Sequence, residues 1–144
     1  MNVGVILASH GEFARAAAGT VEMVAGPLDR TRTLGLAPSM ALADFERLFN
    51  DAYDELSAEC DLVVVLVDIL GGTPFNVVAR AQAAGRPMVA FAGFSIPVLI
   101  ELLICRDQWA CPQDVQDALV RAGQGAFQPI AITVSTTDEA EEDL

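Results

Sequence analysis

The chain has a single histidine, His10, and its surroundings indicate chemistry with phosphate. His10 follows a short apolar run at residues 3–8, stands between the small residues Ser9 and Gly11, and precedes a helical pattern. An imidazole between a strand and a helix lies beside free backbone N–H groups, which favour an anion. Neutral imidazole is a nucleophile that forms phosphohistidine, and the N–H groups would hold the phosphoryl oxygens. We therefore expect His10 to accept a phosphoryl group.

Asp68 ends a second apolar run, at residues 63–67, and a glycine pair follows it. We expect Asp68 to accept a hydrogen bond from one ring nitrogen of His10, which would leave the other nitrogen free to attack. Thr73 is expected to cap the next helix and to offer its hydroxyl to the phosphoryl group. The alternative is that these residues only form a turn and a helix cap. The residues predicted to bind the phosphoryl group are Gly11, Gly71, Gly72 and Thr73.

Composition excludes several other sites. All eight basic residues are arginine, so neither a Walker A phosphate loop nor a lysine Schiff base can form. One histidine cannot build a multi-histidine zinc site, and the three cysteines fit no metal or redox spacing. We therefore predict no metal, no cofactor and reduced cysteines. The formal net charge of −12 argues against nucleic acid as a partner.

The elements that must position these residues alternate along the chain. Apolar runs at 3–8, 31–36, 63–67 and 88–92 predict strands, and three- and four-residue spacings predict helices between and after them. The helical patterns lie near 13–24, 42–56, 74–84, 95–103 and 112–122, where Gly123 is expected to end the last one. One helix face is predicted to bury Leu42 and Leu48, and another Phe13 and Val24. This order predicts one α/β domain with a parallel sheet.

In such sheets, ligands bind at the carboxyl ends of the strands. That rule selects the loops at residues 9–11, 68–74 and 93–97, each of which leads into a helix. A β-like segment at 127–134 contains Pro129, which restricts it to the edge of a sheet. Residues 135–144 carry five negative charges and are expected to form an acidic, disordered tail. No membrane-spanning segment or signal peptide is predicted, so we expect a cytoplasmic protein.

Three segments resemble the mannose-class IIA proteins of the bacterial phosphoenolpyruvate-dependent sugar phosphotransferase system. They read VGVILASHGEFA at residues 3–14, VVVLVDILGGTPFNVVAR at 63–80 and AGFSIPVLIELL at 92–103. The resemblance implies an IIA domain over residues 1–134 and an open, doubly wound, four-stranded parallel sheet of order 2-1-3-4 with helices on both faces. It also implies a homodimer in which the C-terminal strand is exchanged. One departure is Ile69-Leu70, where the family often has a polar and an aromatic residue.

The resemblance also implies a reaction. His10 matches the histidine that accepts a phosphoryl group from phospho-HPr and passes it to a IIB domain, which serves the membrane subunits IIC and IID. Asp68 matches the carboxylate that orients this histidine, and Thr73 the hydroxyl position that lines the site. Neither the sugar nor the choice between transport and regulation follows from the sequence.

Other functions match parts of this pattern. The string SHGE is similar to the start of histidine phosphatases, but the chain lacks the arginine before the histidine and has no second histidine. A related phosphotransfer subunit of dihydroxyacetone kinase shares the chemistry and remains an alternative. A non-catalytic α/β module that senses phosphate is another.

Overall fold

Strands and helices alternate along the computed structural model, which describes residues 1–134 of the chain. The predicted acidic tail at 135–144 lies outside the described residues. Within residues 1–134, none of the helices combines the length and the apolar composition needed to cross a membrane. The elements are β1 (Val3–His10), α1 (Phe13–Ala25), β2 (Thr31–Leu36), α2 (Leu42–Ser57), β3 (Leu62–Val67), α3 (Thr73–Ala83), β4 (Val89–Ala92), α4 (Ile96–Cys105), a 3₁₀ turn (Arg106–Gln108) and α5 (Pro112–Ala126).

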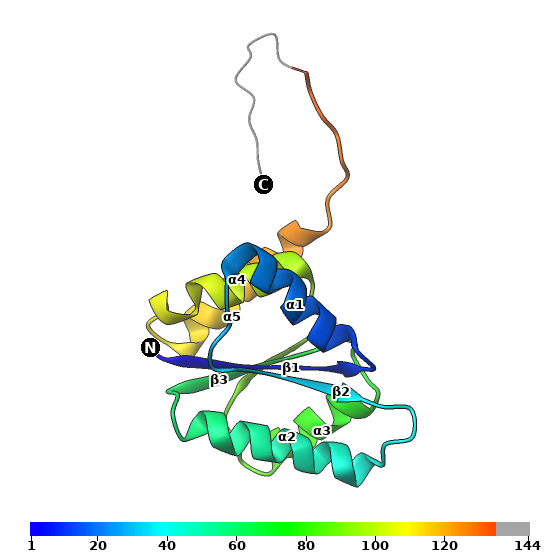
Figure 1. The fold of residues 1–144 in the computed structure, drawn as a ribbon. Helices are drawn as coiled ribbons and strands as arrows, with labels where there is room; N and C mark the ends of the chain where they lie inside the picture. Colours follow the sequence, from blue (N-terminus) through cyan, green and yellow to red (C-terminus); the bar gives the residue numbers. More distant parts are fainter. Residues whose placement is uncertain (135–144) are drawn as a thin grey trace.

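The four strands form one parallel sheet of order β2-β1-β3-β4, which confirms the predicted topology. Helices α1, α4 and α5 cover one face of the sheet, and α2 and α3 cover the other (Figure 1). The two central strands, β1 and β3, are buried on both faces, because helices lie above and below them. Their continuous apolar sequences are therefore typical of parallel strands.

Alternation along β1 sends successive side chains to opposite faces of the sheet. Val5 and Leu7 pack under α1, α4 and α5, whereas Ile6 and Ala8 pack against α2 and α3. The same alternation directs Ser9 toward α1 and its neighbour His10 toward the α2 and α3 side. Two consecutive residues of β1 thus have different roles: Ser9 points into the core, and His10 points toward the site.

Several predicted boundaries and faces are wrong. Helix α5 continues through Gly123 to Ala126, since an isolated glycine weakens a helix without ending it. Thr73 is the first helical residue rather than the cap, because Gly72 occupies the cap position. Four side chains predicted to be buried are exposed because each lies at the border of its helix's apolar stripe: Phe13, Val24, Leu42 and Leu48.

The segment after α5, residues 127–134, has no regular secondary structure in the single chain. Its large apolar side chains point into solvent, and Ile130 and Ile132 are more than four-fifths exposed. The predicted strand is therefore absent from the isolated chain. An extended segment cannot satisfy its backbone groups as a strand without a neighbouring strand edge.

Candidate active site

His10 is the last residue of β1, at the carboxyl edge of the sheet, as the strand-end rule predicts. The strand is longer than predicted and carries the imidazole directly, so the side chain starts from rigid backbone. His10 pairs with Leu36 at the end of β2, and Asp68 follows the end of β3. The loops that follow the central strands β1 and β3 therefore meet at the imidazole.

Asp68 contacts His10 twice through a single oxygen. Its Oδ2 atom accepts the backbone N–H of His10 at 2.9 Å and lies 2.9 Å from Nδ1 of the ring. Its other oxygen, Oδ1, accepts the N–H of Ile69 at 3.0 Å. Burial works to raise the pKa of Asp68, but these hydrogen bonds outweigh it and hold the pKa below its ordinary value. An ionised carboxylate at Nδ1 places the ring proton there and leaves Nε2 as a free nucleophile.

Gly72 lies against the free side of the imidazole. A Cβ atom on Gly72 would come within 3.2 Å of Cε1 and 3.4 Å of Nε2 of His10. Its φ of +87° and the +81° of Gly71 are also values that other residues rarely adopt. The glycine pair therefore keeps Nε2 accessible and brings the backbone that leads into α3 close to it.

Gly11 turns the chain from β1 into α1. It has a φ of +56°, and its N–H donates to the carbonyl of Leu36 at 2.9 Å. That N–H is engaged within the protein, so Gly11 lines the site by its position and its small size. The first turns of α1 and α3 begin on either side of His10, and helix N-termini stabilise negative charge.

A pocket of about 430 Å³ opens beside His10. The sequence did not predict the residues that form one of its walls. Thr73 and Gly11 line it as predicted. The opposite wall is the loop from β2 to α2, because the pairing of Leu36 with His10 brings that loop to the imidazole. The strand-end rule applied to β2 would have found it. The added wall residues are Leu36, Ala37, Pro38, Met40 and Leu42.

The third predicted loop, residues 93–97, contributes to the fold rather than to this pocket. Phe94 stacks on Phe13 with ring centroids 5.0 Å apart, and Ser95 caps α4 by accepting the N–H of Val98 at 3.5 Å. The stack packs the start of α1 against the segment that leads into α4.

Charges near the site are mostly paired with one another. Glu12 lies 3.7 Å from Arg15, and Glu46 on α2 lies 2.8 Å from Arg80 on α3. Among the described residues, Asp68 makes the only ion-pair contact with the imidazole. A bound phosphoryl group would therefore depend on backbone N–H groups and helix dipoles rather than on an arginine.

Comparison with known proteins gives one family. Residues 4–119 match the family model EIIA-man, described as the PTS system fructose IIA component. The chain is 27% identical over 141 residues to the PTS system fructose-specific EIIA component of Bacillus subtilis, covering 98% of this chain and 95% of that one. It is 28% identical over 107 residues to the PTS system mannose-specific EIIAB component of Escherichia coli, covering 74% of this chain and only 33% of that longer protein.

Solved structures agree. A PTS IIA protein associated with the fucose utilization operon of Streptococcus pneumoniae superposes with a TM-score of 0.79 at 36% identity, covering 90% of this chain and 93% of that one. A mannose/sorbose specific IIA subunit from Enterococcus faecalis gives a TM-score of 0.82 at 24% identity, covering 94% and 100%, which shows the shared fold.

Proposed function

Since the chain belongs to the mannose-type IIA family of the sugar phosphotransferase system, whose members are phosphocarriers, we propose that His10 carries the phosphoryl group. The observation that supports this most is the contact of Asp68 with Nδ1 of His10 at 2.9 Å, which leaves Nε2 facing the opening beside Gly72. A single histidine is sufficient for a carrier, because it only has to accept the group and release it.

The proposed step is a displacement at phosphorus. The Nε2 lone pair of His10 forms a bond to phosphorus while the bond from phosphorus to the donor nitrogen breaks, and the electron pair stays on the donor. The ring of His10 keeps its Nδ1 proton and gains positive charge, which the carboxylate of Asp68 stabilises. In the second transfer, an acceptor nucleophile forms a bond to phosphorus while the bond from phosphorus to Nε2 breaks, and its electron pair returns to Nε2.

The phosphoryl oxygens are proposed to lie between the starts of α1 and α3. Gly71 and Gly72, just before α3, and Thr73, its first residue, would face them from one side, with Gly11 on the other. The positive φ of Gly71 and Gly72 lets the backbone before α3 approach closely, and the Thr73 hydroxyl is a further donor.

The donor is proposed to be phospho-HPr and the acceptor a IIB domain, with IIC and IID served indirectly. The apolar wall beside His10 fits a protein partner better than a small phosphate donor. Met40 and Leu42 belong to it, and exposed Ile69 and Leu70 lie on the loop that follows Asp68. Exposed apolar side chains around a reactive group mark protein docking sites.

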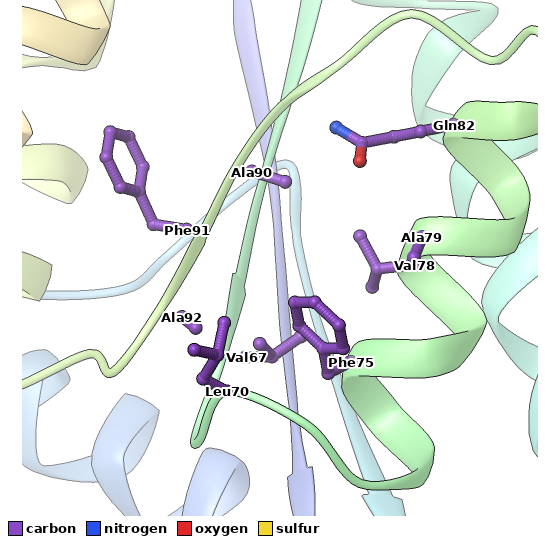
Figure 2. A pocket seen from close by; sticks show the side chains of 9 residues that line it. All are labelled: Val67, Leu70, Phe75, Val78, Ala79, Gln82, Ala90, Phe91 and Ala92. Atoms are coloured by element: carbon purple, nitrogen blue, oxygen red, sulfur yellow. The ribbon is translucent and has the colours of Figure 1, made fainter.

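The proposed homodimer uses the free edge of β4. An apolar pocket of about 240 Å³ lies beside this edge. Figure 2 shows Phe75 and Val78 of α3 on the side of β4 to which Ala90 points, whereas the ring of Phe91 points away from α3. The exposed residues 127–134 alternate apolar side chains, so they suit a strand added to a sheet edge. We propose that each copy places this segment on β4 of the other.

Labelling tests the carrier proposal. Incubation with labelled phosphoenolpyruvate, enzyme I and HPr should place acid-labile, base-stable label on the wild type and none on His10→Ala. NMR should assign the phosphorus to Nε2. Label that persists on His10→Ala would overturn the proposal, and phosphate on Nδ1 would overturn the role given to Asp68.

A further inference from the structure

The hydroxyl of Ser9 connects the strand that carries His10 to the first turn of α1. Ser9 is completely buried, and its Oγ accepts the backbone N–H of Ala14 at 2.8 Å. Ser9 and His10 are neighbours on β1 with side chains on opposite faces of the sheet. A contact that fixes one of them therefore acts on the backbone from which the other projects.

Helix α1 depends on this contact because it has no side-chain cap of its own. The residue at its cap position, Glu12, makes no side-chain hydrogen bond to the helix. Ala14, the second residue of α1, is fully buried, so water cannot satisfy its N–H. Ser9 supplies the missing acceptor from the end of β1, five residues earlier in the chain.

Hydrogen bonds to three neighbouring elements hold the short connection between β1 and α1. The N–H of His10 donates to Asp68, the N–H of Gly11 donates to Leu36, and the N–H of Ala14 donates to Ser9. The first two tie the connection to the end of β3 and to β2. Toward α1, the N–H of Ala16 donates to the carbonyl of Glu12 at 2.9 Å within the connection, and the Ser9 contact joins β1 itself to the first turn of α1. Without that contact, the start of α1 and the His10 backbone could move relative to each other.

We infer that Ser9 is a positioning residue for phosphoryl transfer: its buried hydroxyl locks the β1–α1 connection so that Asp68 keeps the imidazole proton on Nδ1. The inference rests on the proposed carrier role of His10. Ser9 touches neither the imidazole nor the phosphoryl group, so it acts through the geometry of its neighbour. Small displacements of a reacting group cost large factors in rate.

A matched control separates this role from simple helix capping. Ser95 also accepts a backbone N–H at a helix start, but at α4, away from the His10 pocket. Ser9→Ala and Ser95→Ala each remove one hydroxyl acceptor from a helix N-terminus, so both should lower the melting temperature. Only Ser9→Ala should change the protonation of the His10 ring and the rate of phosphoryl transfer.

The first measurement uses the fact that the chain has one histidine. With ¹⁵N-labelled histidine, the two ring nitrogens of the unphosphorylated protein give one assigned pair of signals. In the wild type and in Ser95→Ala, Nδ1 should resonate as protonated and Nε2 as unprotonated. In Ser9→Ala the two signals should move toward each other, and Ser9→Thr, which keeps the hydroxyl, should restore them.

The second measurement is phosphoryl transfer from phospho-HPr. Ser9→Ala should lower the rate at saturating donor about tenfold or more, with the KM for the donor unchanged. Unchanged ring signals in folded Ser9→Ala, or equal changes in Ser95→Ala, would overturn the inference. The ring signals need no donor, so they report on Ser9 even if labelling of His10→Ala were to refute the carrier role.

Discussion

One oxygen atom of Asp68, Oδ2, lies 2.9 Å from both the backbone nitrogen and the ring Nδ1 of His10. The carboxylate therefore fixes the end of β1 and the orientation of the imidazole together. Its side chain is nearly buried while that of His10 is half exposed, so the protein shields the orienting group and presents the nucleophile. This division suits the proposed role of His10, in which the imidazole meets a second protein.

Replacing Asp68 by Asn should slow phosphoryl transfer. The amide keeps the size of the side chain, but it removes the charge that stabilises the phosphorylated ring and the fixed protonation of Nδ1. We expect a loss of about 10²-fold in the single-turnover rate from phospho-HPr, measured by rapid quench, with the fold intact by circular dichroism. A rate near that of the wild type would contradict the role given to Asp68.

The pKa of Asp68 should depend on His10. Although burial works to raise it, the hydrogen bonds from His10 lower it, so the carboxylate stays ionised to lower pH than an ordinary aspartate. A depressed pKa contributes stability above the unfolded-state pKa, and that contribution is lost as pH falls through the folded-state value. A ¹³C titration should find the Asp68 midpoint higher in His10→Ala than in the wild type. Equal midpoints would show that the ring contributes nothing.

The sequence predicts the parts of the site that depend on local signals. His10 follows a continuous apolar run, and Asp68 precedes two glycines, so strand ends and turn residues place both at one edge of the sheet. Gly72, which the sequence places in the loop after Asp68, lies against the imidazole of His10. These predictions need only the order of elements in a parallel sheet.

The remaining parts of the site depend on how elements far apart in the sequence pair and pack. Leu36 reaches the site because β2 pairs with β1 at His10, and the weak apolar signal of residues 31–36 does not specify that pairing. The Ser9 contact with Ala14 likewise depends on how α1 packs over β1. Thr73 was misplaced by one position because Gly72, with its positive φ, takes the cap.

Arg106 should contribute to stability and not to transfer. Its guanidinium is buried and bonds to Asp29 and to Thr31 at the start of β2. His10 instead pairs with Leu36 at the other end of that strand. Arg106→Ala should lower the free energy of unfolding by about 2 kcal/mol in urea, since hydrogen bonds to charged groups are lost. Arg121→Ala, which removes an exposed arginine of α5, should change it little.

The stability that the contact between Arg106 and Asp29 contributes should depend on pH. Burial works to raise the pKa of Asp29, but Arg106 and Arg30 outweigh it and lower the pKa. The stabilisation is therefore complete at neutral pH and is lost as pH falls through the depressed value. The difference between the wild type and Arg106→Ala should shrink at pH 3, whereas a constant difference would exclude the ion pair as its source.

Transfer from HPr should slow as salt rises. The formal net charge is −12, of which five negative charges lie in residues 135–144, and the family's donor is expected to present a basic face. Because Glu12 and Glu46 are paired with arginines, long-range attraction rather than local contacts should steer the encounter. The second-order rate should fall between 50 and 500 mM salt, most of all at the lowest concentrations (about 10 Å screening length at 0.1 M). A rate independent of salt would remove this argument.

Removing residues 127–144 should convert the proposed dimer into a monomer. The segment 127–134 exposes Phe127, Ile130 and Ile132 in the single chain, while β4 presents an unpaired edge flanked by apolar pockets. Pairing the two would satisfy both the backbone groups and the apolar surfaces. Sedimentation of the full chain should give a dimer, and a chain that ends at Ala126 should give a monomer. A chain that ends at Val134 is the matched control: it lacks only residues 135–144, with their five negative charges, and should remain dimeric. A dimer in the chain that ends at Ala126 would place the interface elsewhere on the molecule.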